Sequence, residues 1–419
     1  MINLETNLIQ NFVNNKVDGN LKQPLINPIA FHSTGSATNP STSDFRRVFQ
    51  TSDQLKVKFA HFLNTIFYQL DEKKVFDLME KLLEDPSKSD EEVYNELRTQ
   101  INSTKKAFPV LSKLWSLHVL KKGMGQQAGA LLKGFRKEKF QDYMEVYDRR
   151  YLNTIRAALK FPLKGNSVAV CNSPEVGLAD RIQAGAFFSS YPYKQFEPLN
   201  DPDCTDPFLF TEKTYRPISD RVADNSSDII AILGGLHHIP PSRVDGFVDS
   251  LHRKLKAGGV ILLRDHNVSD PKDADSLAKE DLRAIAAIVH TFVNAENGVE
   301  WKVEKNEIRE FKSVEDCTRL MENHGFKRIS EKELVLKDDP TENAMFAFVK
   351  APTSLEELKA AISYRNDCTR PKEGTMATWI EWGNVRFSKQ YAEYIQNHHA
   401  SAFDSVGHLN SIGNISFIT

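Results

Sequence analysis

The sequence lacks the features that would assign it to a membrane or secreted class. None of its apolar runs approaches the roughly 18–20 residues that a helix needs to cross a bilayer. Its N-terminal stretch, MINLETNLIQNFVNNKV, has neither the basic start nor the apolar core of a secretory signal. We therefore expect an intracellular, cytoplasmic protein without membrane contact, although secretion without a cleaved signal stays open.

Cysteine is scarce, and no charge dominates. The four cysteines, Cys171, Cys204, Cys317 and Cys368, lack the spacing of a metal site, so we interpret them as reduced thiols. With 54 basic and 56 acidic residues the net charge is −2, which gives no reason to expect nucleic acid or an anionic membrane as a partner of the whole chain. A hydrophobic content of 40% with 26% charged residues is typical of a globular protein.

The segment Ser227–His266 predicts a strand, a helix, a glycine turn and a second strand. Asp228–Leu233 is rich in isoleucine, as a strand buried on both faces is. Val244–Leu255 places apolar residues at spacings of three and four, which predicts an amphipathic helix, and Ala257-Gly258-Gly259 would end it. Val260–Leu263 is a second buried strand. A helix between two such strands predicts a βαβ unit in a parallel sheet.

Chemically capable residues follow both strands. Gly234–His238 comes after the first strand, and Arg264–His266 comes after the second. Ligands of open parallel sheets bind just beyond the carboxyl ends of the strands. The sequence therefore predicts a functional site here.

The chain divides into four parts by pattern. Residues 1–43 are rich in Ser, Thr and Asn and predict a flexible N-terminal segment. Residues 44–142 predict an α-helical domain, since apolar residues recur on one helical face and Ser89 has the character of an N-cap. Residues 143–351 predict an α/β domain. Residues 352–419 form a C-terminal extension, interpreted as a lid or an interaction element.

Within the α/β part, Tyr143–Leu159 predicts a helix and Ser167–Cys171 the first strand. Arg216–Asp220 is interpreted as a short third strand. Phe326–Leu336 and Asn343–Lys350 predict an antiparallel hairpin that closes the sheet. Two further helices are expected at Asp275–Asn294 and Ser313–His324.

Basic residues are concentrated between Lys105 and Lys139, with Phe108, Trp115 and Phe135 among them and Glu138 as the single acid. The basic residues are Lys105, Lys106, Lys113, Lys121, Lys122, Lys133, Arg136, Lys137 and Lys139. One interpretation is a face for RNA or another anionic substrate, with Lys121, Lys122, Arg136 and Lys137 as contacts. The other is a solvated helix face whose aromatic residues belong to the core.

A cofactor position is suggested by the turn Asn172–Gly177, which follows a strand at the start of the α/β part. Nucleotide-like cofactors usually bind at such a turn. Glu197 lies twenty residues beyond Gly177, and an acid near this spacing commonly binds ribose hydroxyls. The alternative is an exposed acid at a strand end.

In order and spacing, these segments resemble the class I S-adenosylmethionine-dependent methyltransferases. The resemblance covers roughly residues 145–351 and rests on DIIAILGGLHHIP, LHRKLKAGGVILLRDH, FKSVEDCTRLMENHGFKRIS and ENAMFAFVK. It implies a seven-stranded Rossmann-like sheet, with five parallel strands followed by an antiparallel hairpin. The helical N-terminal domain and the C-terminal extension would be additions to it. It also implies S-adenosylmethionine as the cofactor.

The resemblance further implies a set of cofactor-binding residues. The family carries an acid and a Gly-x-Gly-x-Gly turn after its first strand, whereas VAVCNSPEVG keeps Gly177 alone, with Asn172 at a former glycine. That loop has either been rebuilt or has lost affinity for the cofactor. Glu197 resembles the ribose-binding acid, and Asp220, followed by Arg221, resembles the acid that contacts adenine. The wall that faces the sulfonium would be Gly234, Gly235 and Leu236.

For the chemistry, His237, His238 and His266 are candidate bases near neutral pH, and Asp265 can orient one of them. Arg264 is a candidate substrate contact. The alternative is a structural role for both segments, as a helix start and a salt-bridged loop. Because the ligand spacing is irregular, we predict no metal site.

Two functions from different classes remain open. The first is an S-adenosylmethionine-dependent methyltransferase whose acceptor is RNA, protein or a small molecule. The second is a methyltransferase-fold protein without catalysis that binds a partner or a nucleic acid. The altered loop at residues 172–177 favours the second, and Glu197, Asp220 and the glycines after the fourth strand favour the first. The sequence does not indicate an oligomeric state.

Overall fold

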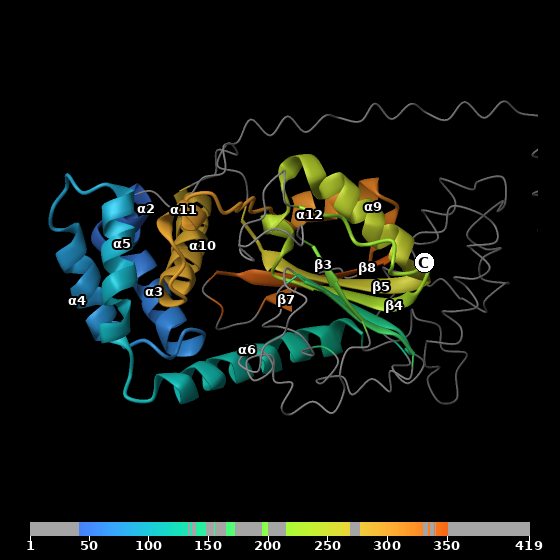
Figure 1. Ribbon diagram of the computed structural model, residues 1–419, viewed down its shortest axis with the longest axis horizontal. Coiled ribbons are helices and arrows are strands. Elements are labelled where there is room, and N and C mark those ends of the chain that lie inside the picture. Colours follow the sequence, from blue (N-terminus) through green and yellow to red (C-terminus); the bar gives the residue numbers. More distant parts are fainter. Residues whose placement is uncertain are drawn as a thin grey trace, which may run out of the picture.

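The computed structural model describes residues 42–132, 135, 140–147, 155, 165–171, 195–199, 215–268, 277–329, 334–335, 339 and 341–350. They form a mixed α/β structure in which one sheet lies between helices and a helical unit adjoins one end of it (Figure 1). Within this part of the chain, no helix combines the length and the apolarity that crossing a bilayer requires.

The described strands form one sheet in the order β3-β2-β1-β4-β5-β8-β6, and β7 also pairs with β8. The strands are β1 (Tyr143–Tyr147), β2 (Ser167–Cys171), β3 (Gln195–Pro198), β4 (Ser227–Leu233), β5 (Leu255–His266), β6 (Phe326–Arg328), β7 (Leu334–Val335) and β8 (Asn343–Lys350). The first five run parallel, and β8 runs antiparallel to β5. Five parallel strands closed by an antiparallel one confirm the α/β fold that the methyltransferase resemblance implies.

The predicted hairpin is present, but its first strand is described in two pieces. β6 and β7 both pair antiparallel with β8, on the side away from β5. Residues 330–333, between them, lie outside the described part. Eight strands are therefore described, two of which lie within the one strand predicted at Phe326–Leu336.

Three predictions of strand position are wrong. Tyr143–Leu159 is predicted as a helix, yet residues 143–147 form β1, between β2 and β4. Ser167–Cys171 is consequently β2 and not the first strand. Arg216–Asp220 is no strand, and the third strand is β3 at Gln195–Pro198. Residues 172–177 therefore continue from β2, while the loop after the central strand begins at residue 148, outside the described part.

A buried acid explains the error at β1. Glu145 lies in the middle of this strand with only 3% of its surface exposed, and the Tyr143 hydroxyl donates to its Oε1 at 2.6 Å. The polar side chain gives YMEVY the pattern of a helix surface, although tertiary pairing on both sides makes it a strand. An internal hydrogen bond satisfies the acid, so its burial is tolerated.

The strands β4 and β5, which lead into the predicted site, are almost wholly buried. All seven residues of β4 are buried, as expected for a strand covered on both faces. β5 begins at Leu255, earlier than predicted, and includes Gly258, whose φ of 77° suits glycine. Helix α9 (Val244–Lys254) connects the two strands and, with α12 (Val314–Asn323), covers one face of the sheet (Figure 1).

The remaining helices include the long α6, which lies on the opposite face of the sheet, and a separate helical unit (Figure 1). They are α2 (Thr42–Arg46), α3 (Asp53–Thr65), α4 (Glu72–Leu83), α5 (Asp90–Gln100), α6 (Pro109–Leu131), α10 (Leu277–Glu296) and α11 (Trp301–Glu304), with short helices η1 (Arg47–Thr51), η2 (Ile101–Thr104), η5 (Leu236–His238) and η6 (Pro241–Arg243). Ser89 caps α5 through a capping box with Glu92, as its sequence predicts.

The helical unit includes α10, which comes from the later part of the chain. Residues of α3, α4 and α5 share one hydrophobic cluster with Ala284, Ile285 and Ile288 of α10. The rings of Phe59 on α3 and Phe292 on α10 lie 4.8 Å apart, centre to centre. The helical unit therefore holds α10 in place beside the sheet.

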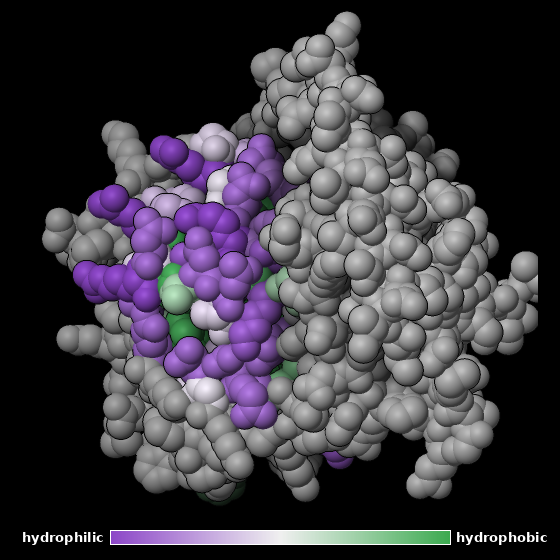
Figure 2. Space-filling model, turned by 90° about the vertical axis from the view of Figure 1, so that its right-hand side faces the viewer, coloured by the Kyte–Doolittle hydropathy of each residue, from purple (hydrophilic) through white to green (hydrophobic). Residues whose placement is uncertain are grey.

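The face seen in Figure 2 is mainly hydrophilic in its described part, with small apolar spots between polar side chains. The described residues there offer no broad apolar surface.

We expect Phe59→Ala to lower the free energy of unfolding by about 3–5 kcal/mol, because it empties the contact between α3 and α10. Val57→Ala is the matched control, since Val57 lies on the same helix with 69% of its surface exposed. Urea denaturation measures both. Equal losses in the two variants would contradict the burial of Phe59 in this cluster.

Candidate active site

The turn after β4 is fastened to the end of β5. Gly234 has a φ of 75°, and its amide donates to the Arg264 carbonyl at 2.6 Å. The chain then forms the short helix η5, which buries both His237 and His238. The two segments predicted from the sequence thus meet at the carboxyl ends of neighbouring strands.

Asp265 joins these segments. One of its carboxylate oxygens accepts from the Nδ1 of His237 and from the His266 amide at 2.8 Å. The other accepts from the His237 amide at 3.2 Å. Burial would raise the pKa of Asp265, but His237 and the hydrogen bonds outweigh it and hold the pKa at about 2.

The contact with Asp265 places the proton of His237 on Nδ1. The opposite nitrogen, Nε2, is buried and has no hydrogen-bond partner. A neutral imidazole in this tautomer presents the Nε2 lone pair, which can accept a proton or bind a metal ion.

His238 is oriented by the segment that follows α11. Its Nδ1 donates to the Ile308 carbonyl at 2.8 Å and lies 3.6 Å from a carboxylate oxygen of Glu307. The His237 carbonyl in turn accepts from the Glu310 amide at 2.8 Å. Residues 307–310 therefore fix both histidines of η5.

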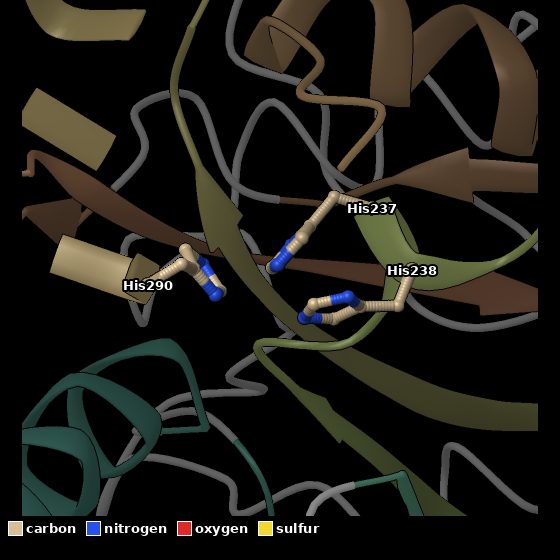
Figure 3. A group of neighbouring side chains, drawn as sticks. All are labelled: His237, His238 and His290. Atoms are coloured by element: carbon tan, nitrogen blue, oxygen red, sulfur yellow. The ribbon is translucent and has the colours of Figure 1, made fainter. Parts of the chain in front are cut away.

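A fourth histidine comes from the helical unit. His290 of α10 lies with its Nε2 3.1 Å from the Nε2 of His266. Its ring centre is 5.0 Å from that of His237 and 5.2 Å from that of His238, and the three side chains point toward one another (Figure 3). Phe311 packs against the rings of His237, His266 and His290. We call His237, His238, His266 and His290 the histidine cluster.

Burial keeps three members of the cluster uncharged at neutral pH. It lowers the pKa of His238 and His290 well below the ordinary value, assisted by the neighbouring histidines, and that of His266 to about 3. Neutral imidazoles are the form that accepts protons and binds metal ions.

A buried charged network supports this site from the side of α10. Arg309 pairs with Glu304 at 2.8 Å and with Glu307, and Asn294 donates to both carboxylates, at 2.7 and 2.9 Å. The paired carboxylates raise the pKa of Arg309 against the effect of burial, so it stays charged. The network connects α10, α11 and the segment that holds His238.

Glu197 is the predicted cofactor residue that the structure places at the carboxyl end of β3. It is buried, and the Gln195 side chain donates to its Oε1 at 2.9 Å. It pairs in register with Val170 of β2, which is level with Val146 of β1. Gly235 and Leu236 adjoin η5, so they lie at the same end of the sheet as Glu197.

Asp220 lies near the opposite end of the sheet. Its carboxylate is 88% exposed and pairs with Arg253, near the end of α9, at 3.4 Å. It is therefore away from the histidine cluster, and residues 216–220 are not the third strand. The Arg221 carbonyl, by contrast, accepts at 3.3 Å from the side-chain amide of Gln195, which also donates to Glu197.

The predicted substrate residues are dispersed. Arg264 is buried and pairs with Asp339 at 2.6 Å. Lys122 of α6 is exposed and Lys121 half-buried, whereas Asn172, Gly177, Arg136 and Lys137 lie outside the described residues. Lys105 pairs with Glu296 at 3.1 Å, and the ammonium of Lys106 lies 3.6 Å from the ring centre of Tyr68. Lys105 and Lys106, at the start of the basic stretch, thus contact other side chains of the protein.

His290, Phe311 and Glu307 belong to the site but were not predicted. For His290 the one signal in the sequence is that His290, Thr291 and Asn294 interrupt the apolar second half of its helix. A helix that packs by its apolar face alone would not need these polar residues.

No family model matches the chain, and no curated protein matches it. Among solved structures, the mitomycin 7-O-methyltransferase MmcR is 14% identical over 72% of this chain and 70% of its own, with a TM-score of 0.34. The pyocyanin biosynthetic protein PhzM is 12% identical over 72% and 75%, with a TM-score of 0.38. The 1,6-didemethyltoxoflavin-N1-methyltransferase of Burkholderia thailandensis is 10% identical over 61% and 87%, with a TM-score of 0.35. Likenesses this weak carry no argument about function.

We expect the free energy of unfolding to fall as the pH is lowered from 7 toward 4. Below about pH 6.5 these histidines take up protons in the unfolded chain but stay neutral in the folded cluster. Each of them therefore lowers the free energy of unfolding by up to about 1.4 kcal/mol per pH unit. Chemical denaturation at several pH values, with chelator present, measures the slope. His266→Gln should make it shallower, and an unchanged slope would contradict the burial of a neutral His266.

Proposed function

We propose that this protein is a methyltransferase that uses S-adenosylmethionine. The observation that carries the proposal is the pair His237–Asp265 at the carboxyl ends of β4 and β5, in a sheet with this strand order. From β1 the strands that follow in the chain are added on one side, as β2 and β3, and then on the other, as β4 and β5, so the strand order reverses between β1 and β4. Open α/β sheets bind their ligands at such a reversal, beyond the carboxyl ends of the strands. The histidine cluster lies next to that position.

The cofactor would lie across the ends of β1, β2 and β4. Glu197, at the carboxyl end of β3, remains our proposed contact for the ribose hydroxyls, and Gly234, Gly235 and Leu236 would border the methyl group. Asn172 and Gly177, which follow β2, remain proposed contacts. Asp220 is left out of this set, because its partner Arg253 lies at the other end of the sheet. Arg221, whose carbonyl shares the Gln195 side chain with Glu197, remains a proposed contact.

When bound, S-adenosylmethionine supplies an electrophilic methyl group. The chain's own residues then have two tasks, to align the acceptor and to remove its proton. The Nε2 of His237 accepts the proton of a hydroxyl, amine or thiol acceptor, while Nδ1 keeps its own proton and donates it in a hydrogen bond to Asp265, whose carboxylate stabilises the imidazolium. The acceptor heteroatom would gain the methyl group in place of the proton that it loses to His237, and the sulfonium would leave as a neutral thioether.

His290 is the partly exposed member of the cluster, so an acceptor would approach from the side of α10. The acceptor class stays open among RNA, protein and small molecules. Lys121 and Lys122 of α6 remain proposed contacts for an anionic acceptor. Arg264 is better suited to holding Asp339 than to binding a substrate, since this pair is fully buried.

Calorimetry with S-adenosylhomocysteine tests the cofactor. We expect binding, and we expect Glu197→Ala to weaken it roughly tenfold, because a hydrogen bond to a charged group contributes about 1.5 kcal/mol or more. Asp220→Ala is the matched control and should bind as the wild type does. Absent binding at millimolar ligand would overturn the proposal and favour a non-catalytic partner-binding role.

The base is tested by methyl transfer to extracts that contain RNA, protein or small molecules, with S-adenosylhomocysteine release as the signal. His237→Gln and Asp265→Asn should each lower kcat about 10²- to 10⁴-fold, with cofactor affinity retained. His324→Gln, which alters a histidine paired with Asp245 and Asp249 on the far side of α9, should keep full activity. Full activity in His237→Gln would exclude this residue as the base.

A further inference from the structure

We infer that the histidine cluster is a binding site for a divalent transition-metal ion of the zinc, cobalt or nickel type, with His237, His238, His266 and His290 as its ligands.

Ligand atoms of the histidine cluster converge. His237, His238 and His290 each offer a ligand atom, and these atoms all lie within 4.8 Å of one another, as do those of His237, Asp265 and His266 (Figure 3). His237 belongs to both sets, and His266 of the second set lies against His290 of the first. Zinc–nitrogen bonds of about 2.0–2.1 Å place tetrahedral ligands about 3.3 Å apart, close to the 3.1 Å between the Nε2 atoms of His266 and His290.

The groups around the cluster hold two of its rings in the way that metal-binding histidines are held. A metal-binding histidine usually donates its other ring N–H to a carboxylate or a backbone carbonyl, which fixes the ring and makes it a stronger ligand. His237 makes such a contact with Asp265, and His238 makes it with the Ile308 carbonyl. Both rings are therefore fixed through Nδ1, and the Nε2 of His237 is buried without a hydrogen-bond partner in the described part of the chain.

Two buried ring nitrogens of the cluster have no hydrogen-bond partner among the described residues. They are the Nε2 of His237 and the Nδ1 of His266. Leaving such groups unsatisfied costs about 1–3 kcal/mol each. A bound ion would satisfy the Nε2 of His237 directly.

The charge nearby does not oppose a cation. Asp265 contributes a carboxylate in contact with His237, and Arg309 is already paired with Glu304 and Glu307. Imidazole ligands select transition metals, whereas magnesium and calcium prefer oxygen ligands. Magnesium is therefore the discriminating negative control.

This inference adds to the proposed function but does not require it. An ion on the Nε2 of His237 occupies the lone pair that would otherwise take the acceptor's proton. In the metal-bound protein, the ion itself would lower the pKa of a coordinated acceptor. His237 thus has two uses that exclude each other at any moment.

The test is titration of the chelator-treated, full-length protein with Co²⁺. We expect one ion per chain, visible absorption bands of a nitrogen-bound cobalt site, displacement by Zn²⁺ and no response to Mg²⁺. His290→Gln should abolish the bands, and Asp265→Asn should weaken binding about 10- to 100-fold. His324→Gln should leave the titration unchanged, because His324 lies outside the cluster. This variant controls for cobalt binding at His324 and its two carboxylate partners, Asp245 and Asp249.

Lack of stoichiometric uptake by the wild type would overturn the inference, as would uptake lost in His324→Gln but kept in His290→Gln. If a variant fails to fold, the wild type still decides the matter, since a native-state ligand must raise its Tm. Metal binding without cofactor binding would remove the proposed function and keep this site, and the reverse result would remove the site alone.

Discussion

A buried carboxylate governs the architecture of this protein's functional end. Asp265 lies in a strand with neighbours on both sides, where an unpaired charge would cost several kcal/mol. The cost of burying this charge is offset by the His237 side chain and by two backbone amides. These partners lie at the end of β5 and in the turn that follows β4. The turn after β4 therefore has little freedom, and the position of His237 follows from the ionised state of Asp265.

The helical unit completes this arrangement. α10 contributes His290 and the polar groups that hold Arg309 and its glutamates, while its apolar face packs in the cluster that contains Phe59. Helices from the first quarter of the chain thus support a side chain that contacts the ends of β4 and β5. Such support is what a preorganised site requires, because loosely held rings would lose the geometry that proton transfer or metal binding needs.

The sequence predicted β4, α9, β5 and β8 well, because strands buried on both faces and amphipathic helices have clear local patterns. It failed at β1, where buried Glu145 gave a central strand the polarity of a helix surface, and this error shifted the numbering of the two strands that follow. Asp220 was assigned to the cofactor for that reason. His237, His238, Asp265 and His266 were found because they follow strands in sequence. His290 depends on the packing of a distant helix, so no local pattern could place it.

The central claim is that the end of the sheet marked by His237 and Asp265 is where a methyl donor and its acceptor meet. A crystal structure with S-adenosylhomocysteine tests it most directly. We expect the ligand to lie across the carboxyl ends of β1 and β4, with its ribose toward Glu197 and its sulfur toward Gly234–Leu236 and the histidine cluster. Ligand bound at the amino ends, near Asp220 and Arg253, would contradict it, and so would a site left empty at saturating ligand.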